Sequence, residues 1–291
     1  MADPPPVMVG LTLPDIDRWS ERVTVALGQN PGLFTGPGTN TYLVGTGRSR
    51  ILLDTGDGRP EYLPVLAKAT EETGCEIQEI VLTHGHVDHI GGAAGVIGQR
   101  GKLRVSKHPW PASDENFDVE LTSIGHGDVI QTEGATLRAV HTPGHAIDHL
   151  CFVLEEERSL FSGDNVLGVG TTVIPAEGGD LLDYMSSLER LLALNPGAIY
   201  PAHGPCIPDG TAKLREYIDH RNDRERQIIE ALGSGPQRIP EIVAVVYAAY
   251  PKALHAPAGQ SVCSHLLKLE RESRVQRSGD ERPIESVWEL S

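Results

Sequence analysis

Apolar positions recur along the chain with two periods, and their alternation predicts a mixed α/β fold. Short runs of Val, Ile, Leu and Thr between glycine-containing turns indicate strands, whereas apolar residues three or four apart indicate helices. The expected strands are 23–27, 41–44, 51–53, 77–82, 103–105, 128–130, 136–140, 149–154 and 159–161, with another ahead of His203; the expected helices are 60–73, 181–194 and a Gly-rich one opening at 91–95. Two mixed sheets faced by helices account for this order.

The pattern changes at about residue 211, where a long charged helix is expected to run to residue 232. The Gly-Ser-Gly-Pro sequence at 233–236 ends it. Two shorter helices at 240–250 and 260–272, followed by strands at 275–277 and 284–290, predict a small winged-helix-like unit. We therefore divide the chain into residues 1–210 and a linker helix plus appendage at 211–291. The second short helix carries a modest basic set, Lys268, Arg271 and Arg274.

The composition is that of an ordinary globular chain. Of its 291 residues, 39% are hydrophobic and 22% are charged, as in folded soluble proteins. No segment approaches the roughly 18 consecutive apolar residues of a membrane helix, and residues 1–6 lack a basic and apolar leader. Four cysteines lie far apart without a Cys-x-x-Cys motif, which fits reduced thiols. We expect an intracellular protein, in the cytoplasm or the mitochondrial matrix, with no membrane association.

The stretch Thr-His-Gly-His-Val-Asp-His at 83–89 carries the clearest chemistry. It places His84, His86, Asp88 and His89 in one short turn after an apolar run. Histidines rarely cluster this way as plain loop residues, whereas three imidazoles and a carboxylate suit a divalent cation such as zinc. The turn therefore indicates a metal site.

Three later positions repeat one local pattern, in which a potential ligand follows an apolar strand and lies in or beside a glycine-containing turn. They are His145, Asp164 and His203. Each alone is more often an ordinary turn residue. In this order after the His-rich turn they favour a two-metal hydrolase, because strand ends are where mixed sheets collect functional side chains.

The series His84-x-His86-x-Asp88-His89, His145, Asp164 and His203 resembles the metallo-β-lactamase superfamily of binuclear zinc hydrolases. The surrounding sequence resembles the β-lactamase-like protein 2 group, which are single-strand-selective zinc endoribonucleases. Fungal polyketide thioesterases of the superfamily share much of the same sequence. Two features depart from the group: Gly85 stands where a bulky aromatic residue is frequent, and the turn 143–149 reads Pro-Gly-His-Ala-Ile-Asp-His where the group commonly has a Thr-Asp pair after the histidine. The runs that carry the resemblance are 28–32, 38–47, 51–56, 132–138, 161–168 and 217–222.

The resemblance implies an αββα sandwich with a winged-helix-like C-terminal domain and two zinc ions per chain. His84, His86 and His145 would hold one ion, and Asp88, His89 and His203 the other. Asp164 would bridge them, and Asp88 and Asp164 would be the catalytic carboxylates. Asp54 is expected to support the ligand loops from behind, and Asn40, Asn165 and Thr172 are expected to line the substrate pocket. A metal-activated hydroxide would attack the substrate.

Three functional classes stay open. The first is an endoribonuclease for single-stranded RNA, and the second is a hydrolase of acyl thioesters or small esters, including weak β-lactamase-type activity. The third is a binding module with a structural metal, which the seven-residue ligand set disfavours. The net charge of −15 lowers the expectation for RNA, because nucleic-acid affinity rests largely on phosphate contacts. RNA or a small acyl substrate is the expected partner, and a homodimer is left open.

Overall fold

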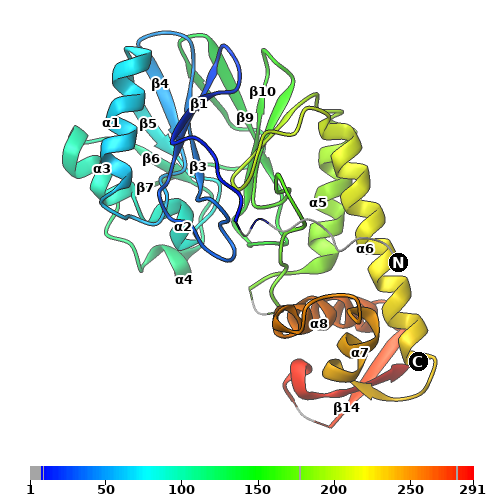
Figure 1. The fold of residues 1–291 in the computed structure, drawn as a ribbon. Coiled ribbons are helices and arrows are strands. Elements are labelled where there is room, and N and C mark those ends of the chain that lie inside the picture. The colour runs from blue at the N-terminus through cyan, green and yellow to red at the C-terminus, as the bar shows by residue number, and fades with distance from the viewer. Residues whose placement is uncertain (1–7, 9, 177, 280) are drawn as a thin grey trace.

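The strands form two large sheets that lie face to face (Figure 1). This computed structural model describes residues 8, 10–176, 178–279 and 281–291, so the leader expectation for residues 1–6 lies outside it. The first sheet is antiparallel from β1 to β4 and parallel from β4 to β7. Its strands in spatial order are β1 (Ile16–Arg18), β2 (Val23–Leu27), β3 (Asn40–Val44), β4 (Ser49–Leu53), β5 (Glu76–Val81), β6 (Val105–Lys107) and β7 (Leu121–Ser123).

The second sheet is antiparallel except at one edge, where β11 and β12 run parallel. Alternate residues of the strands point to opposite faces, so each sheet buries both of its faces. Tyr42 packs with Phe161 between the sheets, whereas its neighbour Leu43 packs with Leu66 of a helix. The second sheet has the spatial order β12 (Ile199–Pro201), β11 (Ser159–Gly163), β10 (Leu150–Leu154), β9 (Ala135–His141) and β8 (Val129–Thr132).

Helices cover the outer face of each sheet, which confirms the αββα sandwich (Figure 1). The first sheet is covered by α1 (Tyr62–Thr73) and α3 (Ala93–Arg100), and the second by α5 (Leu181–Ala193) and the start of α6 (Gly210–Leu232). Two four-residue helices, α2 (Val87–Ile90) and α4 (Pro111–Asp114), lie in loops. Among the described residues, no helix combines the length and the apolar character needed to cross a bilayer.

The C-terminal unit is a winged helix with its own core, as expected from the sequence. It contains α7 (Ile239–Val246), α8 (His255–Arg271) and a three-stranded sheet of β13 (Gln237–Arg238), β15 (Val287–Leu290) and β14 (Val275–Ser278). Single 3₁₀ turns span Lys252–Leu254 and Pro283–Glu285. Trp288 is fully buried among Val262, Leu266 and Leu269 of α8. The end of α6 packs into the same core, so this long helix joins the two units (Figure 1).

Two C-terminal helices differ in extent from the sequence expectation. α8 begins at His255 instead of residue 260, with Pro257 in its first turn. A proline is tolerated there because the first N–H groups of a helix have no partner within it. α7 ends at Val246 instead of residue 250, because the backbone of Tyr247 leaves helical geometry; the Tyr247 ring centre lies 4.0 Å from the buried guanidinium of Arg224. The sequence pattern also missed β1, β7, β13, α2 and α4, which are all short.

Protonation of His265 is expected to destabilise the C-terminal unit in acid. Neither ring nitrogen has a hydrogen-bond partner among the described residues. Burial, followed by the nearby charges of Arg221 and Lys268, holds the pKa of His265 well below 6.5. The unfolded chain therefore binds a proton that the folded chain rejects, and stability falls as the pH drops below about 6.5.

Replacing His265 by leucine should remove this sensitivity. Between pH 7.5 and 5.5 the unfolding free energy of the parent should fall by about 1.4 kcal/mol more than that of His265→Leu. Urea unfolding of metal-free protein at both pH values measures the difference. Equal losses in the two proteins would contradict the assignment.

Candidate metal centre

The seven candidate ligands meet where strands of both sheets end. Parallel neighbours β4 and β5 end on the same side of the first sheet, and β11 and β12 end on the same side of the second. The two sheets are joined at this edge, where Asn40 N donates to Ala202 O at 2.7 Å. Asp54 follows β4, the 84–89 turn follows β5, and Asp164 and His203 follow β11 and β12, while His145 lies in the loop between β9 and β10.

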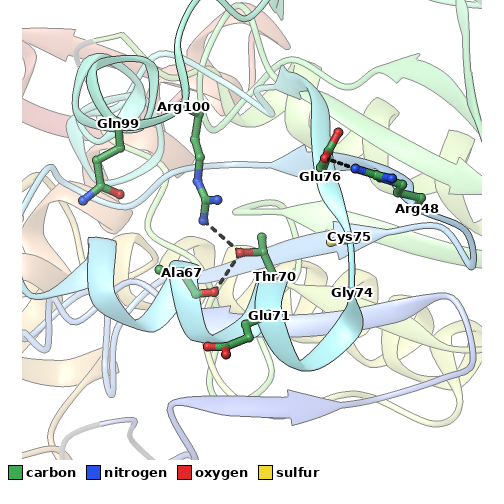
Figure 2. A pocket seen from close by; sticks show the side chains of 9 residues that line it. All are labelled: Arg48, Ala67, Thr70, Glu71, Gly74, Cys75, Glu76, Gln99 and Arg100. Carbon is green, nitrogen blue, oxygen red and sulfur yellow. Dashed lines mark hydrogen bonds and ion pairs between the residues drawn. The ribbon is translucent and has the colours of Figure 1, made fainter.

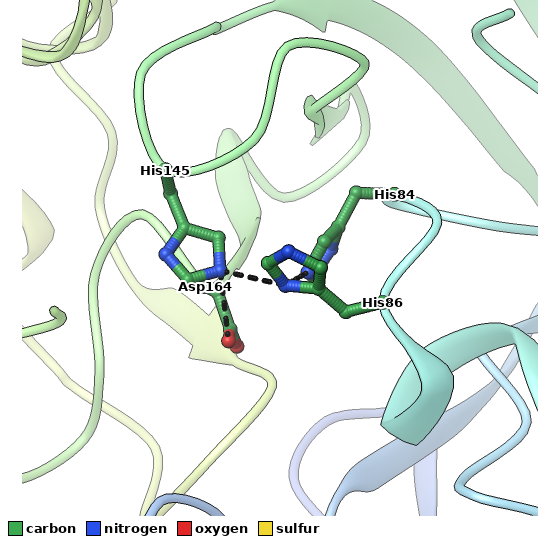
Figure 3. A group of neighbouring side chains, drawn as sticks. All are labelled: His84, His86, His145 and Asp164. Atoms are coloured by element: carbon green, nitrogen blue, oxygen red, sulfur yellow. Dashed lines mark hydrogen bonds and ion pairs between the residues drawn. The ribbon is translucent and has the colours of Figure 1, made fainter. Parts of the chain in front are cut away.

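His84, His86, His145 and Asp164 form the first group, whose possible ligand atoms all lie within 4.8 Å of one another (Figure 3). His145 Nε2 lies 3.1 Å from His86 Nδ1 and 3.4 Å from Asp164 Oδ2. His84 Nε2 lies 2.9 Å from the same nitrogen of His86. The lone pairs of three imidazoles thus converge beside one carboxylate oxygen.

Asp88, His89, Asp164 and His203 form the second group, with the same mutual spacing. Asp164 belongs to both groups, and its two oxygens face different ways. Oδ1 lies 3.1 Å from His203 Nε2 and 3.5 Å from His89 Nε2, whereas Oδ2 faces His145. A carboxylate placed in this way has the geometry of a bridge between two cations.

Burial and neighbouring charges shift the histidine pKa values of the two groups in opposite directions. Burial lowers the pKa of all three imidazoles in the first group, to about 4 for His86. In the second group burial also disfavours the charged imidazole, but nearby carboxylates outweigh it: Asp164 and Asp88 raise the pKa of His203 to about 9. A cation bound there would satisfy the carboxylates in place of that proton, so cation binding and protonation compete.

Residues behind the ligands fix the orientation of their rings. Asp54 Oδ2 lies 2.8 Å from His89 Nδ1 and accepts from the Thr83 hydroxyl at 2.8 Å, which leaves His89 Nε2 facing the second group. His145 Nδ1 likewise lies 3.0 Å from Val173 O, so its Nε2 faces the first group. Hydrogen bonds of this kind select the tautomer of a ligand histidine.

His149 holds the backbone of Asp164, the carboxylate that both groups share. This ring is fully buried, and its Nε2 accepts from Asp164 N at 3.1 Å. The approach requires glycine at 163, because a Cβ there would lie 2.5 Å from His149 Nε2 and the φ angle is +50°. The glycine of the Gly-Asp motif therefore forms the turn and is also the residue that fits sterically beside His149.

The donor set fits a divalent cation in each group. His89 Nε2 and Asp164 Oδ1 are buried atoms that have no hydrogen-bond partner among the described residues. Imidazole nitrogen and carboxylate oxygen are the donors of open, catalytic zinc sites, and such ligation also suits iron or manganese. The geometry brings together all seven residues predicted from the sequence.

A cavity of about 490 Å³ opens onto both groups. Its walls are largely apolar: Leu33 and Phe34 stand at the surface, 57% and 62% exposed, and Leu254 and Pro257 come from the C-terminal unit. Among the described residues, neither lysine nor arginine lines it. The remaining lining residues that the structure describes are Met8, His86, Asp88, His145, Asp164, Leu167, Thr171, Thr172, Val173, Pro175 and His203.

Of the three residues expected in the pocket wall, Thr172 lines the cavity, whereas Asn40 and Asn165 do not. Both asparagines are fully buried. Asn40 Nδ2 donates to the carbonyls of Pro201 and Gly204 at 2.8 Å, and Asn165 Nδ2 donates to Thr142 O at 3.0 Å. These amides are used to hold the ligand loops, so they are not available to substrate.

A buried ion pair behind the His84–His86 turn was missed by the sequence analysis. The Lys107 ammonium lies 2.6 Å from Asp148 Oδ2 and 2.8 Å from Asp114 Oδ1, with its side chain fully buried. A Cβ on Gly85 would lie 3.1 Å from Asp148 Oδ2. Gly85 and the turn that contains Asp148 are the two features that differ from the β-lactamase-like protein 2 group, and they lie next to each other. The absence of a side chain at Gly85 leaves room for the ion pair of Lys107 and Asp148. A lysine at the end of a short strand gives no sequence signal for such burial.

A second cavity, of about 600 Å³, lies over α1 and α3 and contains none of the seven candidate ligands (Figure 2). Four of its polar residues form two pairs: Arg48 lies 2.6 Å from Glu76, and Arg100 donates to the Thr70 hydroxyl at 2.8 Å. Among the described residues, none of those lining it belongs to a group that could hold a metal ion.

The chain belongs to the metallo-β-lactamase superfamily, whose family model matches residues 34–203. A model described as a beta-lactamase associated winged helix domain matches residues 239–286. A Drosophila melanogaster relative named beta-lactamase-like protein 2 homolog is 40% identical over 92% of this chain and 95% of its own length. An atrochrysone carboxyl ACP thioesterase of Aspergillus chevalieri is 41% identical over 90% of this chain and 85% of its own length.

Solved structures agree with the fold. A beta-lactamase domain protein from Burkholderia ambifaria superposes with a TM-score of 0.82 over 97% of this chain and 96% of its own, at 18% identity. A second structure, described as a di-iron-bound form, has a TM-score of 0.51 and 30% identity over 62% of this chain and 93% of its own. Superfamily members are usually hydrolases, and this chain carries the His and Asp groups that could bind metal.

Removing the carboxylate of Asp54 is expected to weaken cation binding at the second group. Asp54→Ala frees the His89 ring to rotate, so the affinity for Zn²⁺ should fall by roughly 10–100-fold. Asp57→Ala is the matched control, because Asp57 lies in the same loop and pairs with Arg59 instead. Chelator-competition titration measures both, and similar affinities for the two variants would refute the supporting role of Asp54.

Proposed function

We propose that this chain is a two-metal hydrolase that cleaves thioesters or esters of small apolar acyl groups. Zinc is the cation that the imidazole-rich donor set favours, with two ions per chain and Asp164 as the bridge. The observation that supports this substrate class is the wall of the cavity at the two groups, which is apolar and contains no lysine or arginine among its described residues. An acyl chain gains free energy by leaving water for such a wall.

The charge distribution supports an acyl substrate over RNA. RNA binding needs cations along a path that follows the phosphates. The net charge is −15, and the basic residues in the last turn of α8 and just after it already face carboxylates. Lys268 lies 2.7 Å from Glu225, Arg274 lies 2.6 Å from the same residue, and Arg271 pairs with Asp180.

The chain's own residues supply binding, orientation and proton handling. When bound, a pair of such cations provides a nucleophilic water at neutral pH and polarises the oxygen under attack. The apolar wall would hold the acyl chain and exclude bulk water from the reacting carbon. We assign Asp88, which is partly exposed and lies 3.2 Å from His203 Nε2, as the carboxylate that would accept a proton during hydrolysis.

Cleavage of single-stranded RNA is the second candidate. It is favoured by 40% identity over nearly the full length of the relative named beta-lactamase-like protein 2 homolog. Two divalent cations would add about four positive charges at the cavity, where a short unpaired segment could bind. The cavity wall offers such a substrate no other cation, which is why we place RNA second.

Metal analysis tests the two-metal part of the proposal. Purified protein dialysed against Zn²⁺ should retain about two ions per chain, because each group supplies four donors. Asp164→Ala should retain about one at most, since both groups lose their shared ligand and only the first keeps three imidazoles. Asp219→Ala, which removes an exposed aspartate of α6, should match the parent. Two retained ions in Asp164→Ala would overturn the bridging assignment.

Acyl-chain dependence tests the substrate class. The parent should hydrolyse octanoyl thioesters with a lower KM than acetyl thioesters, and Phe34→Ala should raise the octanoyl KM by roughly 3–10-fold with little change for acetyl. Val245→Ala, which trims an equally exposed residue of α7, is the control. A KM that does not depend on chain length in the parent would argue against an apolar acyl substrate.

The same preparation should be incubated with labelled single-stranded RNA. Little cleavage is expected, and whatever is seen should disappear in His86→Ala if it belongs to this site. Efficient RNA cleavage that His86→Ala abolishes, with no thioester hydrolysis, would reverse the order of the two candidates. Equal RNA cleavage by parent and variant would indicate a contaminant.

A further inference from the structure

The segment 168–176 lies between the candidate metal centre and the C-terminal unit. On one side, Thr172 and Val173 line the cavity beside His145. On the other side, Ala176 packs against the core of the C-terminal unit. The segment contains no helix or strand among its residues, so its conformation depends on what its backbone contacts.

Three successive carbonyls of this segment point alternately to the two sides. Thr172 O accepts from Arg221 Nη2 of α6 at 2.5 Å, and Ile174 O accepts from the Ser264 hydroxyl of α8 at 2.7 Å. Between them, Val173 O lies 3.0 Å from His145 Nδ1. Neighbouring carbonyls of an extended chain face opposite ways, so fixing the two outer carbonyls also fixes the direction of the middle one.

Arg221 is well suited to hold this segment still. It is 4% exposed, and its guanidinium lies 5.4 Å from the ring centre of Tyr184, so it has little freedom to move. A charged donor to a carbonyl in a buried place makes a stronger bond than a neutral donor. Ser264 can also donate to Gln260 O at 3.0 Å, and the shorter distance favours Ile174.

We propose that Arg221 and Ser264 are positioning residues for the metal centre: by clamping the carbonyls of Thr172 and Ile174, they aim Val173 O at His145 and keep His145 Nε2 directed at the first group. The C-terminal unit and its linker helix are then part of the hydrolase site. This inference rests on the metal-binding part of the proposed function and is independent of the substrate.

Single-site backgrounds separate the two groups. His203→Ala leaves only the first group complete, and His86→Ala leaves only the second. In the His203→Ala background, Arg221→Met should lower the Zn²⁺ affinity by roughly 10–100-fold, and Ser264→Ala by roughly 3–10-fold. In the His86→Ala background both changes should alter the affinity by less than about twofold, because His145 does not belong to the second group.

Arg224→Met is the matched control for the loss of a buried arginine. Arg224 lies one turn along α6 and is 6% exposed. It contacts Val246 O and the Tyr250 hydroxyl, both within the C-terminal unit. Arg224→Met should therefore lower the folding stability about as much as Arg221→Met does. In both single-site backgrounds it should leave the Zn²⁺ affinity within about twofold of the value measured without the Arg224 change.

Four outcomes overturn the inference. The first is an unchanged Zn²⁺ affinity of the first group in Arg221→Met, and the second is an equal loss of Zn²⁺ affinity at both groups in that variant. The third is an equal loss of Zn²⁺ affinity in Arg224→Met. The fourth applies if Arg221→Met fails to fold: it is an unchanged Zn²⁺ affinity in Ser264→Ala and Arg221→Lys. Failure of the proposed function looks different: the unsubstituted backgrounds would then bind no Zn²⁺ or the parent would hydrolyse no substrate.

Discussion

A single buried carboxylate, Asp164, joins the two halves of the site. Its oxygens face imidazoles from different loops, Oδ1 toward His203 and Oδ2 toward His145. Burial leaves the imidazoles of the first group neutral, whereas those of the second group depend on the nearby carboxylates, and without the imidazoles the Asp164 carboxylate would be too costly to bury. The backbone is shaped to hold it: Gly163 adopts a positive φ angle, and His149 receives the N–H of Asp164.

The packing of the two sheets explains why Asp164 lies beside candidate ligands that are distant from it in the sequence. Parallel pairs in both sheets end at one edge, and the inter-sheet core of residues such as Tyr42 and Phe161 keeps the two edges in register. Short ligand loops then need only modest support, which Asp54 gives to His89 and Val173 O gives to His145. The precision of the site thus derives from rigid strands and from hydrogen bonds one layer behind the ligands.

The C-terminal unit contributes to the site in a way that its fold class would not indicate. A winged helix with basic residues at the end of its second helix and just after it is compatible with nucleic-acid binding, yet here those residues are held in ion pairs with Glu225 and Asp180. The unit instead supplies Leu254 and Pro257 to the cavity wall. Function follows from where its side chains lie, and fold alone does not decide it.

The sequence by itself determined the superfamily, the αββα order and the set of seven residues that the fold brings together, because ligand clusters and strand periodicity are local patterns. It could not determine what Asn40 and Asn165 contact, or that Lys107 and Asp148 form a buried pair beside Gly85. It also gave no sign that Arg221 contacts the Thr172 carbonyl, since that bond joins residues 49 positions apart. Such contacts, and the apolar wall built from four separate parts of the chain, exist only once the sheets and the C-terminal unit have packed, because burial and pairing are properties of the assembled fold.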